Sequence, residues 1–177
     1  AQERTSGFPG NLGNDVLVSR DGSVFGATNL GLGILRKGTQ AWTHLRGMDA
    51  QKKIEGLYDP DGRIAKTTRR LFTPFTAPLA EDHVTALAED DAGRIWIGYR
   101  TRGIELFSPR TLSVERPKGF DPEQFVTRIA FTGPVALAAT YGDGLAGAIY
   151  SIPARPASAA GVAPHPSVAA LPAASEL

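Results

Sequence analysis

Short apolar runs separated by glycine-marked turns dominate this sequence. In the clearest stretch, residues 83–109, an apolar strand, an Asp/Gly turn, a second apolar strand and a Gly-marked turn into a third follow one another. Residues 14–36 show the same order. Apolar runs this short, flanked by glycine, are typical of strands rather than helices. Their repetition predicts an all-β protein in which each unit buries apolar surface against its neighbours.

Four turn glycines bring four units into register: Gly22, Gly62, Gly93 and Gly133. The spacing is close to the ~40 to 50 residues of a four-stranded propeller blade, although the interval from Gly62 to Gly93 is shorter. The second unit is degenerate, because basic and Thr residues at 63–70 replace the apolar strand expected there. The expected strands are 16–19, 23–28, 33–37 and 41–45 in the first unit, 84–88, 94–98, 103–107 and 113–116 in the third, and 126–131, 135–141 and 147–152 in the fourth.

Several expected strands are apolar at consecutive positions instead of alternating. Residues 95–97, 16–18 and 135–139 are all apolar. Alternation is typical of a sheet with one face in water, whereas continuous apolar runs indicate strands covered on both faces.

The third unit resembles the repeats of the two-component regulator propeller family. The resemblance rests on Ile-Trp-Ile-Gly at 95–98, Gly103-Ile104 and Phe-Ser-Pro at 107–109. Tyr99 stands where threonine is usual, but Thr28 and Thr140 hold that position in the first and fourth units. The resemblance extends over residues 8–152 and implies a β-propeller that acts as the sensor part of a regulator, often recognising carbohydrate.

We therefore expect a β-propeller, or a partial propeller, of about four antiparallel blades. The expected organisation is a leader at 1–12, repeats at 13–47, 53–78, 82–118 and 124–152, and a disordered Ala/Pro-rich tail at 153–177. By resemblance, regulator-type propellers carry six to eight blades, so four units leave three solutions. The chain closes as a small ring, pairs with another chain, or is one piece of a longer polypeptide; we favour association or truncation.

Composition narrows the function classes. A net charge of +1 over 177 residues gives no general attraction to nucleic acid or membranes, and no apolar run reaches the ~18 residues of a membrane helix. The absence of cysteine excludes thiolate catalysis and Cys-ligated zinc. The start at Ala-Gln-Glu is what signal peptidase would leave, so we expect a periplasmic or secreted protein.

The sequence offers no catalytic set, no cofactor motif and no metal site. His44, His83 and His165 lie in different contexts without metal-ligand spacing. The Asp-Pro-Asp-Gly at 59–62 lacks the remaining calcium ligands and is interpreted as a turn. The basic cluster within 52–70 has few interleaved aromatics, which disfavours nucleic-acid binding.

The loops that follow the second strand of each unit are the best binding candidates, because equivalent loops of a propeller gather on one rim. Arginine there can offer paired donors to carboxylates or sugar hydroxyls. The alternative, that these residues are ordinary hairpin tips, stays open. The candidate ligand-binding residues are Asn29, Arg100, Arg102, Tyr141 and Asp143, with His83 just before the first strand of its unit.

Three functions are considered. The first is a non-enzymatic binding module for a carbohydrate or another small polar ligand. The second is an assembly subunit that docks through exposed blade faces, with a protein partner or a second copy completing the propeller. A propeller lyase or hydrolase is disfavoured because no catalytic residues emerge.

Overall fold

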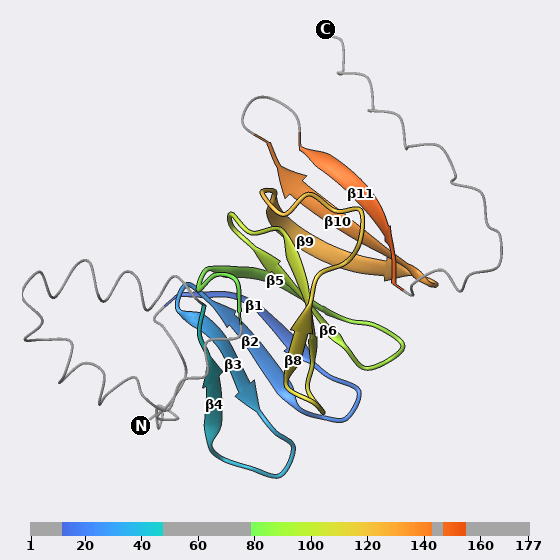
Figure 1. Cartoon of the computed structure of the whole chain (residues 1–177). Helices are drawn as coiled ribbons and strands as arrows, with labels where there is room; N and C mark the ends of the chain where they lie inside the picture. The colour runs from blue at the N-terminus through green and yellow to red at the C-terminus, as the bar shows by residue number, and fades with distance from the viewer. Residues whose placement is uncertain (1–11, 48–78, 143–146, 155–177) are drawn as a thin grey trace, which may run out of the picture.

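The computed structural model describes residues 12–47, 79–142 and 147–154, and within these ranges the chain forms only strands and turns. Three antiparallel sheets follow one another along the chain. They fan side by side in Figure 1, from the blue first sheet through the green and yellow middle sheet to the orange last sheet. The predicted all-β, propeller-type architecture is confirmed.

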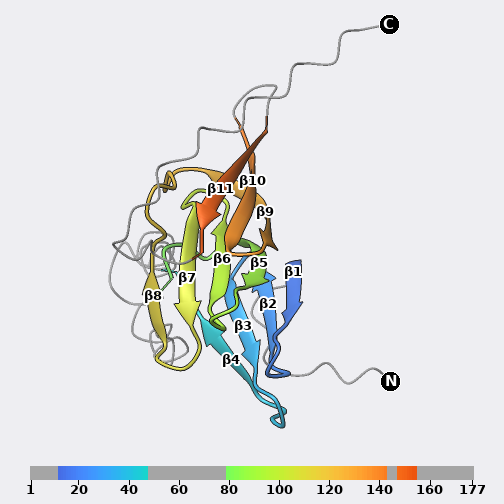
Figure 2. The same cartoon turned by 90° about the vertical axis from the view of Figure 1, so that its right-hand side faces the viewer.

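Each sheet is a simple meander. In Figure 2 the middle sheet runs in chain order from β5 across β6 and β7 to β8. The first sheet holds β1 (Gly13–Val18), β2 (Val24–Thr28), β3 (Gly31–Leu35) and β4 (Trp42–Leu45). The middle sheet holds β5 (Val84–Glu89), β6 (Ile95–Tyr99), β7 (Ile104–Ser108) and β8 (Ser113–Glu115). The last sheet holds β9 (Phe125–Thr132), β10 (Val135–Tyr141) and β11 (Ala148–Pro153).

Every strand predicted in the first, third and fourth units has a counterpart, with ends shifted by a few residues. β3 starts earlier than expected because Gly31 already pairs with Thr28 across a tight hairpin. The turn glycines have the expected left-handed backbone, with φ of 86° at Gly22 and 77° at Gly93. These angles explain why glycine recurs there, since other residues rarely adopt them.

Some predicted segments lie outside the described residues. These are residues 1–11 of the leader, the second unit at 53–78 and the tail from 155 onwards. The first two residues of the predicted tail are described: Pro153 ends β11, and Ala154 is buried at 8% exposure.

The middle sheet is covered on both faces. Ile95, Ile97 and Tyr99 belong to the apolar cluster shared with the first sheet. Trp96, between the two isoleucines, belongs to the cluster shared with the last sheet. Successive side chains of a strand point to opposite faces. The unbroken apolar run at 95–97 therefore serves two cores, as predicted.

The end sheets differ from that expectation. In β1 only Leu17 packs against the core, whereas Val16 and Val18 are 67% and 68% exposed. In β10, Ala136 and Ala138 are fully buried against the middle sheet, while Leu137 faces the other way and is half-buried. The prediction of two covered faces is wrong for these strands, because each end sheet has a neighbouring sheet on one side only among the described residues.

The first and middle sheets are direct neighbours. The amide of Asn14 donates to the carbonyl of Val84 at 2.6 Å, and the backbone N–H of Leu87 donates to the carboxylate of Asp15 at 2.8 Å. These bonds join strands β1 and β5. The first and middle sheets are therefore in direct contact, whereas the degenerate unit predicted at 53–78 lies outside the described residues.

Candidate functional site

Loops of neighbouring sheets meet along one edge of the molecule. The backbone N–H of Gly31, after β2, donates to the carbonyl of Asp82 at 2.7 Å. The N–H of Arg100, after β6, donates to the carbonyl of His83 at 3.2 Å. The N–H of Gly103 donates to Gln124 at 3.1 Å, so this edge continues to the start of β9. We call the edge the rim and define it by Asn29, His83, Arg100, Phe125 and Tyr141.

Three rim side chains form a row across the middle and last sheets. The guanidinium of Arg100 lies 5.9 Å from the ring centroid of Phe125. That ring lies 5.8 Å from the ring of Tyr141, tilted by 55°. Arg100 is exposed, and Tyr141 is 66% exposed. Within the described part of the chain, the guanidinium makes no hydrogen bond or ion pair.

This row combines two kinds of recognition. A cation over an aromatic face is held by the ring quadrupole, which keeps the arginine fork in place while its N–H groups stay in water. Such a fork can donate paired hydrogen bonds to a carboxylate. The exposed ring of Tyr141 adds an apolar face with a polar hydroxyl. The arrangement suits a ligand with both an apolar face and oxygen acceptors.

A buried acid holds the loop that carries Arg100 in place through hydrogen bonds. The carboxylate of Glu81, which is 7% exposed, accepts bonds from the N–H of Thr101 at 2.8 Å and from its hydroxyl at 3.1 Å. Because Thr101 follows Arg100 directly, these bonds fix the loop before any ligand arrives. Such preorganisation lowers the entropy lost on binding.

Further buried carboxylates brace the chain behind the rim. Asp82 accepts two bonds from the guanidinium of Arg46, at 2.9 and 2.7 Å, which ties the end of β4 to the entry of β5. The carboxylate of Glu105 accepts a hydrogen bond from the hydroxyl of Tyr99 at 2.7 Å. Burial, together with the charge of Glu105, raises the pKa of Tyr99 well above its ordinary value. The carboxylates of Asp82 and Glu105 thus accept hydrogen bonds from other residues of the fold.

The structure brings some of the predicted site residues together and separates others. Arg100 lies beside His83 through the backbone bond and is linked to Tyr141 through Phe125. Asn29 lies at the same edge, half-buried, and its Oδ1 has no hydrogen-bond partner among the described residues. Arg102 is exposed but joins no described contact of the row. Asp143 lies outside the described residues.

Sequence reasoning missed Phe125, although a signal was present. Val84 pairs with Tyr99, and Val126 pairs with Thr140, which holds the same repeat position. Phe125 therefore stands in the last sheet where His83 stands in the middle one. Applying the repeat register to residues just before each first strand identifies it.

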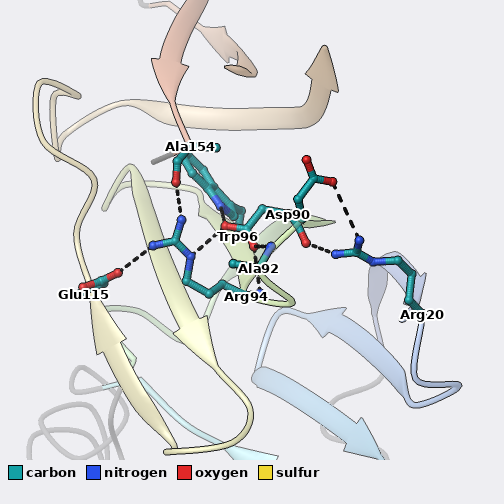
Figure 3. Close-up of polar contacts among 8 residues, drawn as sticks. Arg20, Asp90, Ala92, Arg94, Trp96, Glu115 and Ala154 are labelled. Carbon is teal, nitrogen blue, oxygen red and sulfur yellow. Dashed lines mark hydrogen bonds and ion pairs between the residues drawn. The ribbon is translucent and has the colours of Figure 1, made fainter. Parts of the chain in front are cut away.

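A second polar cluster lies at the opposite ends of these strands, where Figure 3 shows Asp90 at its centre. Its Oδ1 accepts from the N–H groups of Ala92 and Arg94 at 3.0 and 2.9 Å. Its Oδ2 accepts from Arg94 Nε at 2.7 Å and Trp96 Nε1 at 3.0 Å. Arg94 also reaches Glu115 and the carbonyl of Ala154.

The surroundings of Asp90 make it a structural residue. Burial tends to raise the pKa of its carboxyl, but the bonds from Trp96 and Arg94 outweigh burial and lower the pKa. Both oxygens are occupied by hydrogen bonds from Ala92, Arg94 and Trp96, so the carboxylate holds the turn that follows β5. In the described ranges, His, Asp and Glu residues form no group of three or more that could hold a metal ion.

Comparison with known proteins agrees with the repeat pattern. Residues 78–101 match the family model described as two component regulator propeller, so this segment is similar to the repeats of that family. No curated protein matches the chain.

Two solved structures from B. thetaiotaomicron share the fold. One is the extracellular domain of the hybrid two component system BT3049, with a TM-score of 0.53 and 17% identity, covering 86% of this chain and 15% of that one. The other is the extracellular domain of the one component system BT4673, with a TM-score of 0.53 and 14% identity, covering 84% of this chain and 16% of that one. The chain thus spans a small part of either protein and shares their β-propeller fold.

Proposed function

We propose that this chain is a non-enzymatic binding module, similar to the sensor part of regulator-type propeller proteins, and that its rim binds a small polar ligand such as a carbohydrate. The observation that carries the proposal is the row of Arg100, Phe125 and Tyr141. It places the exposed donors of Arg100, which lies on an anchored loop, next to an aromatic pair of the last sheet that includes the exposed ring of Tyr141. Aromatic faces and a few polar groups are what small-molecule sites combine.

The buried acids support a binding role over catalysis. Glu81, Glu105 and Asp90 each accept hydrogen bonds from the scaffold. A catalytic acid or base has to reach the substrate from an open site. The described carboxylates that are buried are instead committed to holding strands and loops.

A periplasmic or secreted location is part of the proposal. It is supported by the similar solved structures, which are described as extracellular domains. No helix in the described ranges is long and apolar enough to cross a membrane.

A glycan array that includes acidic saccharides tests the proposal directly. Loss of one charge-assisted hydrogen bond costs about 1.5 to 3 kcal/mol, so Arg100→Ala is expected to weaken binding by roughly 10- to 100-fold. Tyr141→Ala should weaken it as well. Arg110→Ala is the matched control, since Arg110 is also exposed but lies in the turn after β7, at the other end of the middle sheet.

Two results would contradict the proposal. One is a folded native chain that binds no saccharide or small polar ligand on the array. The other is binding that Arg100→Ala and Arg110→Ala weaken equally, because the rim would then have no special part in it.

A second candidate function, an assembly subunit, is favoured by a separate observation. Val16 and Val18 on the first sheet and Ile149 on the last are 67%, 68% and 62% exposed. Apolar residues gathered on a sheet face are typical of surfaces that pack against another protein element.

A further inference from the structure

The guanidinium of Arg100 keeps its hydrogen-bonding capacity free at the rim. Arg46 and Arg94, in contrast, are each paired with a buried carboxylate. Arg100 makes no hydrogen bond or ion pair with a described residue, and its contact is the ring of Phe125 at 5.9 Å. Because a ring attracts the cation without accepting its N–H groups at their ends, the donors of Arg100 stay available to a ligand.

The ring beneath Arg100 is itself held in place. Phe125 is half-buried at the start of β9, and its backbone pairs with that of Tyr141 on β10. The two rings lie 5.8 Å apart between their centroids. The direction of the guanidinium is therefore set by side chains that are already packed in the absence of a ligand.

The backbone that carries Arg100 is also fixed. The N–H of Tyr99 donates to the carbonyl of Gly103 at 2.9 Å, which closes the loop between β6 and β7. Gly103 has a φ of +66°, and a Cβ there would lie 2.8 Å from the carbonyl oxygen of Asp121. The loop thus packs directly against the segment that leads into β9.

A second positive charge lies on the same loop. Arg102 is exposed and forms no ion pair with a described residue. Its Cα lies at most about 7 Å from that of Arg100, which is within the Debye length of about 8 Å at physiological ionic strength. Glu81 beneath the loop is buried and bonded to the loop itself. The exposed acids of the adjoining segment, Asp121 and Glu123, pair with neither arginine.

These features favour an anionic partner over a neutral one. The planar fork of an arginine matches a group that presents two oxygens side by side, as a carboxylate or a sulfate ester does. Hydrogen bonds to such a charged acceptor are roughly twice as strong as those to a neutral hydroxyl. The ring of Tyr141, 66% exposed beside Phe125, offers an apolar face for the part of the ligand next to the anionic group.

We propose that the rim recognises the anionic group, a carboxylate or a sulfate ester, of an acidic saccharide. This inference rests on the proposed binding function and adds to it the charge of the ligand. Arg100 donates paired hydrogen bonds to two anionic oxygens, and Tyr141 packs against the sugar ring that carries them. Phe125 is a positioning residue for the guanidinium, and Arg102 attracts the ligand through its charge.

A glycan array arranged in matched groups tests the inference. In each group the same saccharide backbone carries a carboxylate, the methyl ester of that carboxylate, a sulfate ester or no acidic group. The native chain is expected to bind an acidic member at least about tenfold more tightly than the methyl ester or the neutral member. Comparison of the carboxylate and sulfate arms identifies which anion the rim prefers.

Variants of Arg100 separate charge from shape. Arg100→Gln should weaken binding of the acidic member by roughly 10- to 100-fold and change that of the methyl ester much less, so that the preference disappears. Arg100→Lys keeps the charge but loses the planar fork, so its loss should be intermediate. Arg110→Gln is the matched control, because Arg110 is exposed at the other end of the middle sheet.

The positioning role of Phe125 has its own readout. Phe125→Leu removes the ring beneath the guanidinium and should weaken binding of the acidic member about 2- to 5-fold, more than that of the methyl ester. Circular dichroism checks that this variant keeps its strands, since Phe125 is half-buried. Added salt provides a test on the native chain alone, because it should weaken binding of the acidic member and leave the methyl ester unaffected.

Three results would overturn the inference, and they are distinguishable from one another. Equal binding of acidic and neutral members, with the same loss for both in Arg100→Gln, removes the charge preference but leaves saccharide binding at the rim intact. A preference for acidic members that Arg100→Gln does not change places the anion away from this side chain. A folded native chain that binds no member of the set overturns the proposed function, and the charge preference with it.

Discussion

Replacing Asp90 with alanine should destabilise the fold more than any exposed substitution. The carboxylate is the acceptor for Trp96 Nε1, which is fully buried, and for the Nε of Arg94, whose side chain is 19% exposed. Without it, the indole N–H is left unsatisfied, at about 1 to 3 kcal/mol, and the arginine loses a buried partner. Breaking a buried ion pair from one side costs about 3 to 5 kcal/mol. We expect a loss of about 3 kcal/mol, because Arg94 keeps its contacts with Glu115 and Ala154.

Urea unfolding followed by tryptophan fluorescence measures this loss. The midpoint should fall while the slope stays constant, since the substitution changes stability and not the surface exposed on unfolding. Asp91→Ala is the control, because its carboxylate is 76% exposed and pairs only loosely with Arg20 at 3.8 Å. It should change stability by less than about 0.5 kcal/mol.

A double-mutant cycle tests the assigned cause. Trp96→Phe removes the indole N–H, so it should cost about 1 to 2 kcal/mol less in the Asp90→Ala background than in the native chain. A destabilisation below about 1 kcal/mol for Asp90→Ala, or additive effects in the cycle, would refute the view that this bond is a main support of the turn.

Two further predictions concern the backbone and pH. In Gly31→Ala the new Cβ would lie 2.2 Å from the carbonyl oxygen of Leu45, at a backbone φ of +112°. We therefore expect the free energy of unfolding, measured with urea, to fall by at least about 2 kcal/mol. Gly38→Ala is the control, because Gly38 has a φ of +78° but open space around it, and it should lower the free energy of unfolding by only about 1 kcal/mol. Because burial and Glu105 raise the pKa of Tyr99, its contribution to stability is complete below about pH 10 and falls as pH rises above that value. Thermal unfolding between pH 9 and 11 should therefore decline less steeply for Tyr99→Phe, and parallel curves would contradict this.

Local chemistry explains why so many strands were predictable. Asp-Gly turns and short apolar runs depend on neighbouring residues, and Gly22 and Gly93 have the positive φ that their turns require. The apolar run at 95–97 predicted that both faces of its strand are covered, because the side chains of such a strand are apolar on either side.

The same pattern misled at the ends of the fold. Residues 16–18 and residues 95–97 are both continuous apolar runs. A run of this kind has the same composition whether one face of its strand is covered by another sheet or both are. The sequence pattern records what a face is suited to pack against, whereas exposure depends on which sheets are present. Val16 is thus apolar and 67% exposed.

The rim was only partly predictable for a related reason. Register between units located His83, Arg100 and Tyr141 on one edge, since equivalent loops repeat. It could not show that the Arg100 guanidinium lies over Phe125, because that contact joins side chains from two different sheets.

The most direct test of the binding role is an NMR titration of the ¹⁵N-labelled chain with the strongest saccharide from the array. The proposal predicts that the largest amide shifts fall at the rim, at Arg100, Thr101, Phe125 and Tyr141, while the turns at Gly38 and Arg110 stay unchanged. Shifts centred on those turns, or absent from the rim at saturation, would contradict it.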